Sequence, residues 1–350
     1  MRFDFARLAR TGLYGAVWSG RVPADVAGAP PLSVWQWRRH VHEQAHRSLT
    51  TEPALWVLYP IPGDDPIWIP FGPRDLETGA AGAQRMLSDA GVSRGDVVLA
   101  VAPPAPWAGN TLPYLFSSAD RLVAFDPPAR ADSLRSDEGL AGVAVFPLSV
   151  TTVEYKSDLA VFPLSRGPTV IAGSRGDMEA LLALAQRAGQ RRPRFRLALV
   201  VGFAVAAHAS DLSDSTAELL YVPGMFAPAG GRPDVPGVWL PPAAVHVELI
   251  PDEEWGRAAQ DPSRVPAILT AAESVGAAGE LVVTVANSVL PVIRLRTALR
   301  VRVADADPAV GIRIEVLNRM APRTRDAAAA FAPAARPGRT RQNHRADREA

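Results

Sequence analysis

The sequence predicts an α/β protein, and three observations carry this prediction. Apolar residues recur at helical spacing after Pro73, and a short apolar strand over 97–101 follows them. Helix and strand patterns alternate again over 168–202, where a strand, an Ala/Leu-rich helix and a further strand follow one another. The 33 prolines indicate many short elements in place of long helices. With 350 residues, the chain is long enough to bury a sizeable core.

Composition excludes several classes of protein. The absence of cysteine excludes disulfides, thiolate metal ligands and a cysteine nucleophile. The net charge of +1 provides no strong steering toward nucleic acid or a membrane. The N-terminus lacks the apolar core of a signal peptide, and the longest apolar run, 197–207, is too short to span a bilayer. We therefore expect a cytoplasmic protein with neither nucleic acid nor membrane as its partner.

The N-terminal region predicts a helix with a zinc-like motif. Ser33 is suited to cap a helix over 34–47. Within it, His42, Glu43 and His46 form an HExxH pattern, which on one helix face could ligate zinc while the glutamate activates a water molecule. No third ligand stands in a second motif, and the neighbouring residues are basic. The sequence therefore favours a solvated polar helix face, with no metal.

Residues 54–72 predict two strands around a turn that spans Pro62 to Pro66. The next segment predicts a helix over 73–90 that ends at Gly91, followed by the strand mentioned above. A short strand is expected at 121–125.

The phrase AVFPLS occurs at 144–149 and again at 160–165, which predicts an inserted hairpin used in core packing. Ser174 and Asp177 then predict the start of the helix in the second strand–helix–strand unit. Strands are expected within 237–250 and in a hairpin over 279–300, with a polar loop between them at 251–278. The last 30 residues are Arg-rich and low in complexity, so we expect disorder over 321–350.

Two stretches resemble the AMP-forming acyl-CoA ligases, and most closely the phenylacetate-CoA ligase branch. The first, GELVVTVANSVLPVIRLRTALR at 279–300, is similar to the hairpin that closes the large domain of those enzymes. The second, LSDAGVSRGDVVLAV at 87–101, resembles their helix–strand unit. The resemblance covers about residues 5–303 and implies two helix-flanked sheets with a small β-subdomain. It divides the chain into a core over 1–236, a β-rich subdomain over 237–320 and the tail, without the ligases' C-terminal lid domain.

The resemblance also implies where a nucleotide would bind, and the residues there depart from the ligase pattern. The phosphate loop of the ligases is rich in Ser, Thr and Gly, whereas this chain has Gly63 followed by Asp64 and Asp65, with no Ser, Thr or Lys. Two carboxylates would repel a triphosphate at contact distance. A later nucleotide-contacting turn ends in an acid in the ligases, but here Gly202 is followed by Phe203 and Ala204.

Two ligand positions of the ligases are also changed. Tyr221 matches a conserved pattern of the ligases, but the position of their magnesium-binding glutamate is Met225, which cannot ligate Mg²⁺. In the closing hairpin Arg296 matches, while the position of the ribose-binding aspartate is Leu299. We therefore expect no bound cofactor.

Three functions remain open. The leading one is a non-adenylating pseudoenzyme of a biosynthetic pathway. It would bind an acyl or aryl ligand, or a partner protein such as an active ligase or an acyl carrier protein. A homodimer is compatible with this function. The first alternative is an acyl- or aryl-activating ligase completed by another chain. The second is a zinc hydrolase built on His42, Glu43 and His46.

Overall fold

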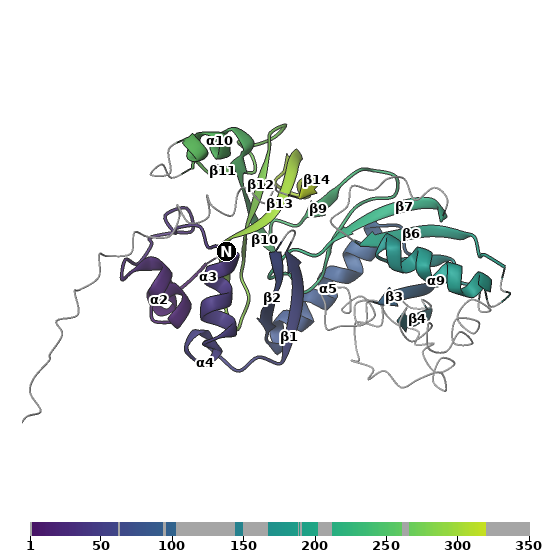
Figure 1. The fold of residues 1–350 in the computed structure, drawn as a ribbon, viewed down its shortest axis with the longest axis horizontal. Helices are drawn as coiled ribbons and strands as arrows, with labels where there is room; N and C mark the ends of the chain where they lie inside the picture. The colour runs from purple at the N-terminus through teal and green to yellow at the C-terminus, as the bar shows by residue number, and fades with distance from the viewer. Residues whose placement is uncertain are drawn as a thin grey trace, which may run out of the picture.

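A computed structural model of the chain describes most of its length (Figure 1). The described residues are 2–61, 64–93, 96–102, 144–149, 167–187, 189, 191–201, 212–260 and 266–319. The predicted strand at 121–125, the second AVFPLS copy and the Arg-rich tail lie outside them.

Short helices form the N-terminal layer of the molecule. They are α1 (Phe5–Leu8), α2 (Gly12–Trp18), α3 (Val34–Trp37), the π-helix η1 (Arg38–His42) and α4 (Ala45–Ser48). Thr11 caps α2, and Ser33 caps α3 through a capping box with Gln36, as the sequence predicted for Ser33. The prediction of one helix over 34–47 was wrong, because the backbone leaves helical geometry at Gln44, with φ −136° and ψ 41°.

A two-stranded hairpin follows, formed by β1 (Leu55–Ile61) and β2 (Asp64–Phe71). The prediction of two strands is confirmed, with a turn shorter than expected because Asp64 already pairs with Ile61. The helical layer covers the free edge of β2: Trp37 Nε1 donates to the Trp68 carbonyl at 2.9 Å. Unpaired strand edges need such cover, because exposed N–H and C=O groups invite other chains.

The parallel half of the large sheet places its strands in the order β7-β6-β5-β3-β4. The strands are β3 (Val97–Ala102), β4 (Ala144–Ser149), β5 (Val170–Gly173), β6 (Phe195–Val201) and β7 (Ser213–Leu220). Helix α5 (Pro73–Asp89) packs through Ala83 and Leu87 on one face, and α9 (Arg175–Arg187) packs through Met178 and Leu181 on the other. The buried apolar face of each helix thus fixes it to the sheet.

The antiparallel half continues the same sheet beyond β7 in the order β8-β9-β14-β13-β12-β10-β11. Its strands are β8 (Ala229–Gly230), β9 (Val238–Leu240), β10 (Val245–Pro251), β11 (Leu269–Thr270), β12 (Ala278–Val285), β13 (Val292–Asp307) and β14 (Gly311–Arg319). The predicted α/β class is confirmed, but the two sheets are joined through β8 and β9 into one twelve-stranded order. Figure 1 shows the parallel half flanked by helices and the antiparallel half beside the hairpin β1–β2.

Five elements escaped the sequence analysis. Strands β8 and β14 were not expected, the predicted polar loop holds α10 (Asp252–Gln260) and β11, and β7 lies in a stretch without a clear apolar period. The first AVFPLS copy is β4, which pairs in parallel with β3. No helix in the described ranges is long and apolar enough to cross a membrane.

The GVSRGDV turn of the second ligase-like stretch serves a structural purpose. Asp96 is buried and accepts hydrogen bonds from Ser93 N at 2.8 Å, Thr169 Oγ1 at 2.8 Å and Arg196 Nη2 at 2.5 Å. Burial acts to raise the pKa of Asp96, but these hydrogen bonds outweigh it, so the pKa lies below its usual value. One carboxylate thus joins the start of β3 to the residue before β5 and to β6.

Candidate functional site

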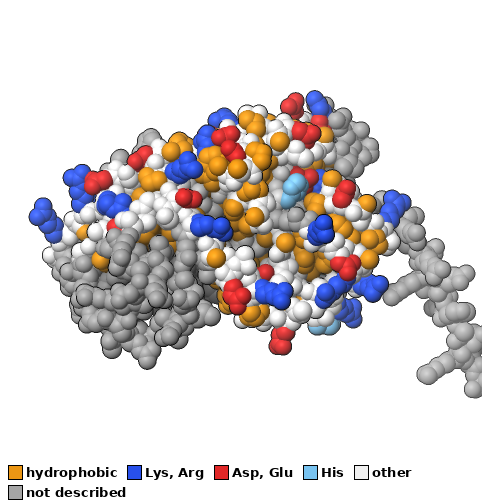
Figure 2. All heavy atoms as spheres, turned by 180° about the vertical axis from the view of Figure 1, so that it is seen from behind, with side chains coloured by type: hydrophobic (Ala, Val, Ile, Leu, Met, Phe, Trp, Pro, Cys, Tyr) orange, Lys and Arg blue, Asp and Glu red, His pale blue; other side chains and the backbone are white. Residues whose placement is uncertain are grey.

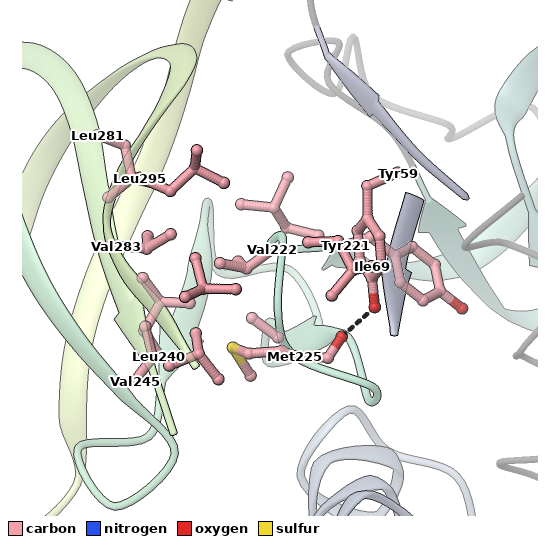
Figure 3. Packing of buried hydrophobic residues seen from close by; sticks show 14 of the residues in the cluster. Tyr59, Ile69, Tyr221, Val222, Met225, Leu240, Val245, Leu281, Val283 and Leu295 are labelled. Atoms are coloured by element: carbon pink, nitrogen blue, oxygen red, sulfur yellow. Dashed lines mark hydrogen bonds between the residues drawn. The ribbon is translucent and has the colours of Figure 1, made fainter. Parts of the chain in front are cut away.

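The candidate site lies where three segments meet: the hairpin β1–β2, the loop 221–228 that follows β7, and the hairpin β12–β13. Figure 3 shows loop residues Tyr221, Val222 and Met225 beside Tyr59 and Ile69 of the β1–β2 hairpin, with the antiparallel strands on the other side. Those strands contribute Leu240, Val245, Leu281, Val283 and Leu295. All of these side chains belong to one buried hydrophobic cluster. The region is therefore packed as protein core.

The loop after β7 packs closely against β12 and β13. Gly224 has φ +94°, and a Cβ there would lie 2.9 Å from Val292 Cγ2 and 3.0 Å from Val285 Cβ. Only a glycine accommodates both this left-handed backbone and this close approach. The tight contact brings Met225 against the β1–β2 hairpin, where its main-chain oxygen accepts a hydrogen bond from the Tyr59 hydroxyl.

Tyr59 and Tyr221 are both buried, with exposed fractions of 0% and 2%. Burial, followed by the proximity of Tyr221, raises the pKa of Tyr59 well above its ordinary value. Tyr59 therefore stays a neutral hydrogen-bond donor and is unsuited to act as a base. Met225 is also buried, so a thioether occupies the position that the resemblance assigns to a magnesium ligand.

Arg296 lies in the sheet interior and pairs with a carboxylate. Its Nε and Nη2 donate to Glu280 Oε2 at 3.1 and 3.0 Å, and its guanidinium lies 4.4 Å from the centre of the Trp255 ring. Glu280 also accepts from the Ala298 main-chain N–H at 3.1 Å. Both charged side chains are almost fully buried. A buried ion pair is stable only when hydrogen bonds and a close partner offset the loss of water around the charges. Glu280 and Trp255 provide these contacts, so Arg296 has a structural role.

Leu299 is 1% exposed and belongs to the same core. It follows an irregularity in β13: Glu280 lies opposite Arg300 and Val282 opposite Arg296, and Ala298 between them has φ +57°. Such a bulge turns side chains away from regular alternation. In this chain the bulge carries Leu299 to a core position, without an exposed acceptor for a ribose hydroxyl.

A second buried ion pair was missed by the sequence analysis. Arg294 Nε donates to Glu248 Oε2 at 2.8 Å, and Arg294 Nη1 donates to the main-chain oxygens of Ala27 and Ala29 at 2.8 and 2.7 Å. Arg294 thereby fastens the segment before α3 to β13. The sequence of β10 could have identified Glu248, because an acidic residue between apolar residues of a strand needs a buried partner.

The remaining predicted positions divide into two groups. Asp65 is exposed on β2, and Asp64 pairs with Ile61 through the backbone ladder. Gly63 and Gly202 lie outside the described residues. The structure therefore brings Tyr221 and Met225 together with Tyr59, whereas Arg296 and Leu299 lie further along the sheet on β13.

The HExxH pattern does not lie on one helical face. His42 ends η1, Glu43 follows it, and His46 lies in α4 beyond the break at Gln44. His42 Nε2 accepts a hydrogen bond from the Trp68 main-chain N–H at 2.8 Å. Burial, and then the charge of Arg38, lower the pKa of His42. Within the described part of the chain, no group of three His, Cys, Asp or Glu side chains is placed to hold a metal ion.

Comparison with solved structures shows the fold of AMP-forming ligases. 2-Hydroxyisobutyryl-CoA ligase in complex with R3-HIB-AMP matches with a TM-score of 0.61 and 13% identity, over 93% of this chain and 70% of that chain. The same enzyme with 2-HIB-AMP and CoA matches with a TM-score of 0.58 and 14% identity, over 89% and 65%. AtGH3.15 acyl acid amido synthetase in complex with 2,4-DB matches with a TM-score of 0.53 and 12% identity, over 90% and 66%.

The chain thus has the α/β fold of the adenylate-forming enzymes and spans about two thirds of the length of these ligases. No protein-family profile matches the sequence, and no curated protein does.

Proposed function

We propose that this chain, which shares its fold with the adenylate-forming ligases, is a non-adenylating relative of the phenylacetate-CoA ligase branch. In this proposal it binds an acyl or aryl ligand or a partner protein, such as an active ligase or an acyl carrier protein, and does not form an adenylate. The proposal draws on the resemblance of two sequence stretches, the shared fold and the chemistry of the residues at the ligand positions.

The observation that carries the proposal is the packing of the loop after β7. A magnesium ligand must offer oxygen, because Mg²⁺ binds carboxylates, water and phosphate. Here Met225 supplies a thioether, lies 6% exposed and has its carbonyl oxygen bonded to Tyr59. Adenylation needs a divalent cation to neutralise the reacting phosphates, and this loop supports no such role.

The position of Leu299 supports the same proposal independently. A ribose-binding residue needs an acceptor that a ligand can reach, whereas Leu299 is an apolar side chain within the core. The acidic turn gives a third argument, since Asp64 and Asp65 occupy the positions that the resemblance assigns to the phosphate loop of the ligases. Loss of one group could be compensated, but three separate changes all oppose binding of a triphosphate.

Isothermal titration calorimetry of the full chain with ATP–Mg²⁺ tests the proposal. We expect no binding heat at protein and nucleotide concentrations that would reveal a millimolar Kd. The same titration with a non-hydrolysable acyl-adenylate analogue examines the whole nucleotide–acyl pocket. Tight binding of either compound, or release of pyrophosphate by the chain alone, would contradict the proposal.

The alternative of a ligase completed by another chain is favoured by one observation, the extent of the shared fold. The match covers 93% of this chain but 70% of the 2-hydroxyisobutyryl-CoA ligase chain. A second polypeptide could supply what this chain does not align with. An ATP–pyrophosphate exchange assay on the chain, on its co-expressed neighbour and on the mixture distinguishes the two functions. The alternative predicts exchange only in the mixture, whereas under the leading proposal an active partner exchanges equally well without this chain.

A further inference from the structure

The N-terminal helical layer is basic, unlike the other segments that the structure describes. Residues 2–50 contain seven arginines and three acidic residues, a net +4 with histidine neutral. The whole chain carries +1, which leaves −3 for all other residues. The Arg-rich tail over 321–350 also carries a net +4, so residues 51–320 carry −7. Among the described residues, positive charge is thus concentrated in α1–α4 and their connections. At the lower right of Figure 2, the side where these helices lie, Arg side chains gather with histidine.

An exposed tryptophan lies in this layer. Trp35 is 58% exposed, the largest value among the exposed large hydrophobic residues of the described chain, whereas Trp37 on the same helix is fully buried. The Arg39 guanidinium lies 5.2 Å from the centre of the Trp35 ring. Stacking on a cation orients the ring without covering it, and Arg39 itself is exposed.

The backbone around Trp35 is held firmly in place. Ser33 and Gln36 form the capping box of α3. Trp37 donates a hydrogen bond to the Trp68 carbonyl on β2, and His42 accepts one from the Trp68 N–H. Arg47 on α4 is exposed, and its Cβ would lie 3.0 Å from a Cβ at Gly12 of α2. A rigid scaffold therefore presents an exposed aromatic ring and guanidinium groups, which lowers the entropy lost when another molecule binds.

We propose that Trp35 and Arg39 form the centre of a docking surface for an acidic face of a partner protein. This inference deepens the proposed function, because it names the chemistry of the partner that a non-adenylating chain would hold. Trp and Arg are the residue types that contribute most at protein interfaces, and a basic surface favours association with an acidic one. The packed core at the ligand positions also favours a surface role over a buried one.

A protein partner fits these residues better than a nucleic acid does. Nucleic-acid binding depends on many phosphate contacts along an extended basic track. The helical layer has a net charge of only +4 and lacks lysine altogether, while the described neighbourhood of Arg39 offers one exposed ring for stacking. One exposed aromatic ring stacked on a guanidinium group has the composition of a protein interface core.

The test uses the full chain and a fluorescein-labelled 20-residue helical peptide with Glu on one face and Leu on the other. We expect saturable binding by fluorescence anisotropy that weakens as salt rises. Arg39→Glu and Trp35→Ala should each weaken it by about tenfold or more. Arg85→Glu is the matched control, because Arg85 is exposed on α5 and its reversal gives the same net charge. Unfolding curves confirm that the variants remain folded.

Three results would overturn the inference. Equal weakening by Arg39→Glu and Arg85→Glu would show that only net charge matters. Tighter binding of a 20-nucleotide single-stranded DNA than of the peptide would assign the surface to nucleic acid. Self-association of the chain in sedimentation experiments, lost in Arg39→Glu, would assign it to a second copy. Binding of ATP–Mg²⁺ would contradict the proposed function while leaving this measurement unaffected.

Discussion

The Tyr59 hydroxyl donates a hydrogen bond to the main-chain oxygen of Met225, 166 residues away in the sequence. This bond joins β1 to the loop after β7 and lies within the hydrophobic cluster (Figure 3). It connects the two segments that, in the resembled ligases, would hold the phosphates and the magnesium ion.

Replacing Tyr59 by phenylalanine should destabilise the fold by about 1–3 kcal/mol, because the buried Met225 oxygen would lose its partner. Urea unfolding followed by fluorescence measures the change. Met225→Leu is the control: it keeps the main-chain oxygen and nearly the same volume, so it should cost less than about 1.5 kcal/mol. A larger effect in the control than in Tyr59→Phe would contradict the assigned role of the hydrogen bond.

The Arg296–Glu280 pair should be strongly coupled. Arg296→Leu should cost about 3–5 kcal/mol, since it leaves the Glu280 carboxylate buried without its cation. The double variant Arg296→Leu/Glu280→Leu should recover part of that loss. Arg300→Ala is the comparison, because the Arg300–Asp252 pair is about one third exposed and should contribute at most about 1 kcal/mol. Equal losses in the two arginine variants would contradict this account.

Placing an aspartate at position 299, as the resemblance to the ligases suggests, should destabilise the chain without creating a nucleotide site. Leu299→Asp places a carboxylate in the core and should cost at least about 3 kcal/mol. Calorimetry should still detect no ATP–Mg²⁺ binding, because the acidic turn and Met225 remain. Leu299→Met should be tolerated, with a loss below about 1.5 kcal/mol. Nucleotide binding by a stable Leu299→Asp variant would contradict the prediction.

The depressed pKa of Asp96 predicts a loss of stability at acid pH. Its folded pKa lies below the ordinary value of 3.8, so its contribution is fully present above that pH and disappears as the pH falls through the folded pKa. Asp96→Asn should remove this contribution. The gap in unfolding free energy between the two proteins should therefore narrow as the pH falls below about 3.8. A gap that stays constant would show that Asp96 acts by shape alone.

The two histidines of the HExxH pattern should behave differently from zinc ligands. His42→Ala should cost about 1 kcal/mol, because the Trp68 N–H loses its acceptor, whereas His46→Ala should lie within about 0.5 kcal/mol of the parent. Protein purified without a His-tag should contain no stoichiometric zinc by elemental analysis. Stoichiometric zinc that both substitutions abolish would instead support the hydrolase alternative.

Local patterns explain why much of the fold could be predicted. Apolar spacing identified α5 and α9, the capping residues Ser33 and Ser174 marked helix starts, and β-rich runs identified the closing hairpin. These features depend on neighbours a few residues apart, which a sequence displays directly. The prediction of a single helix over 34–47 was wrong because Gln44 adopts a non-helical conformation and the Ser48 hydroxyl donates a hydrogen bond to the His40 main-chain oxygen.

The sequence alone determined the α/β class and the residue types available at positions 225 and 299. Only the tertiary structure decided what those residues do instead: Met225 and Leu299 became core, and Arg296 became the partner of Glu280. The reason is physical, because burial and pairing depend on contacts between segments that are distant in the chain. A residue type restricts the chemistry of a position, but its surroundings determine whether that chemistry is used.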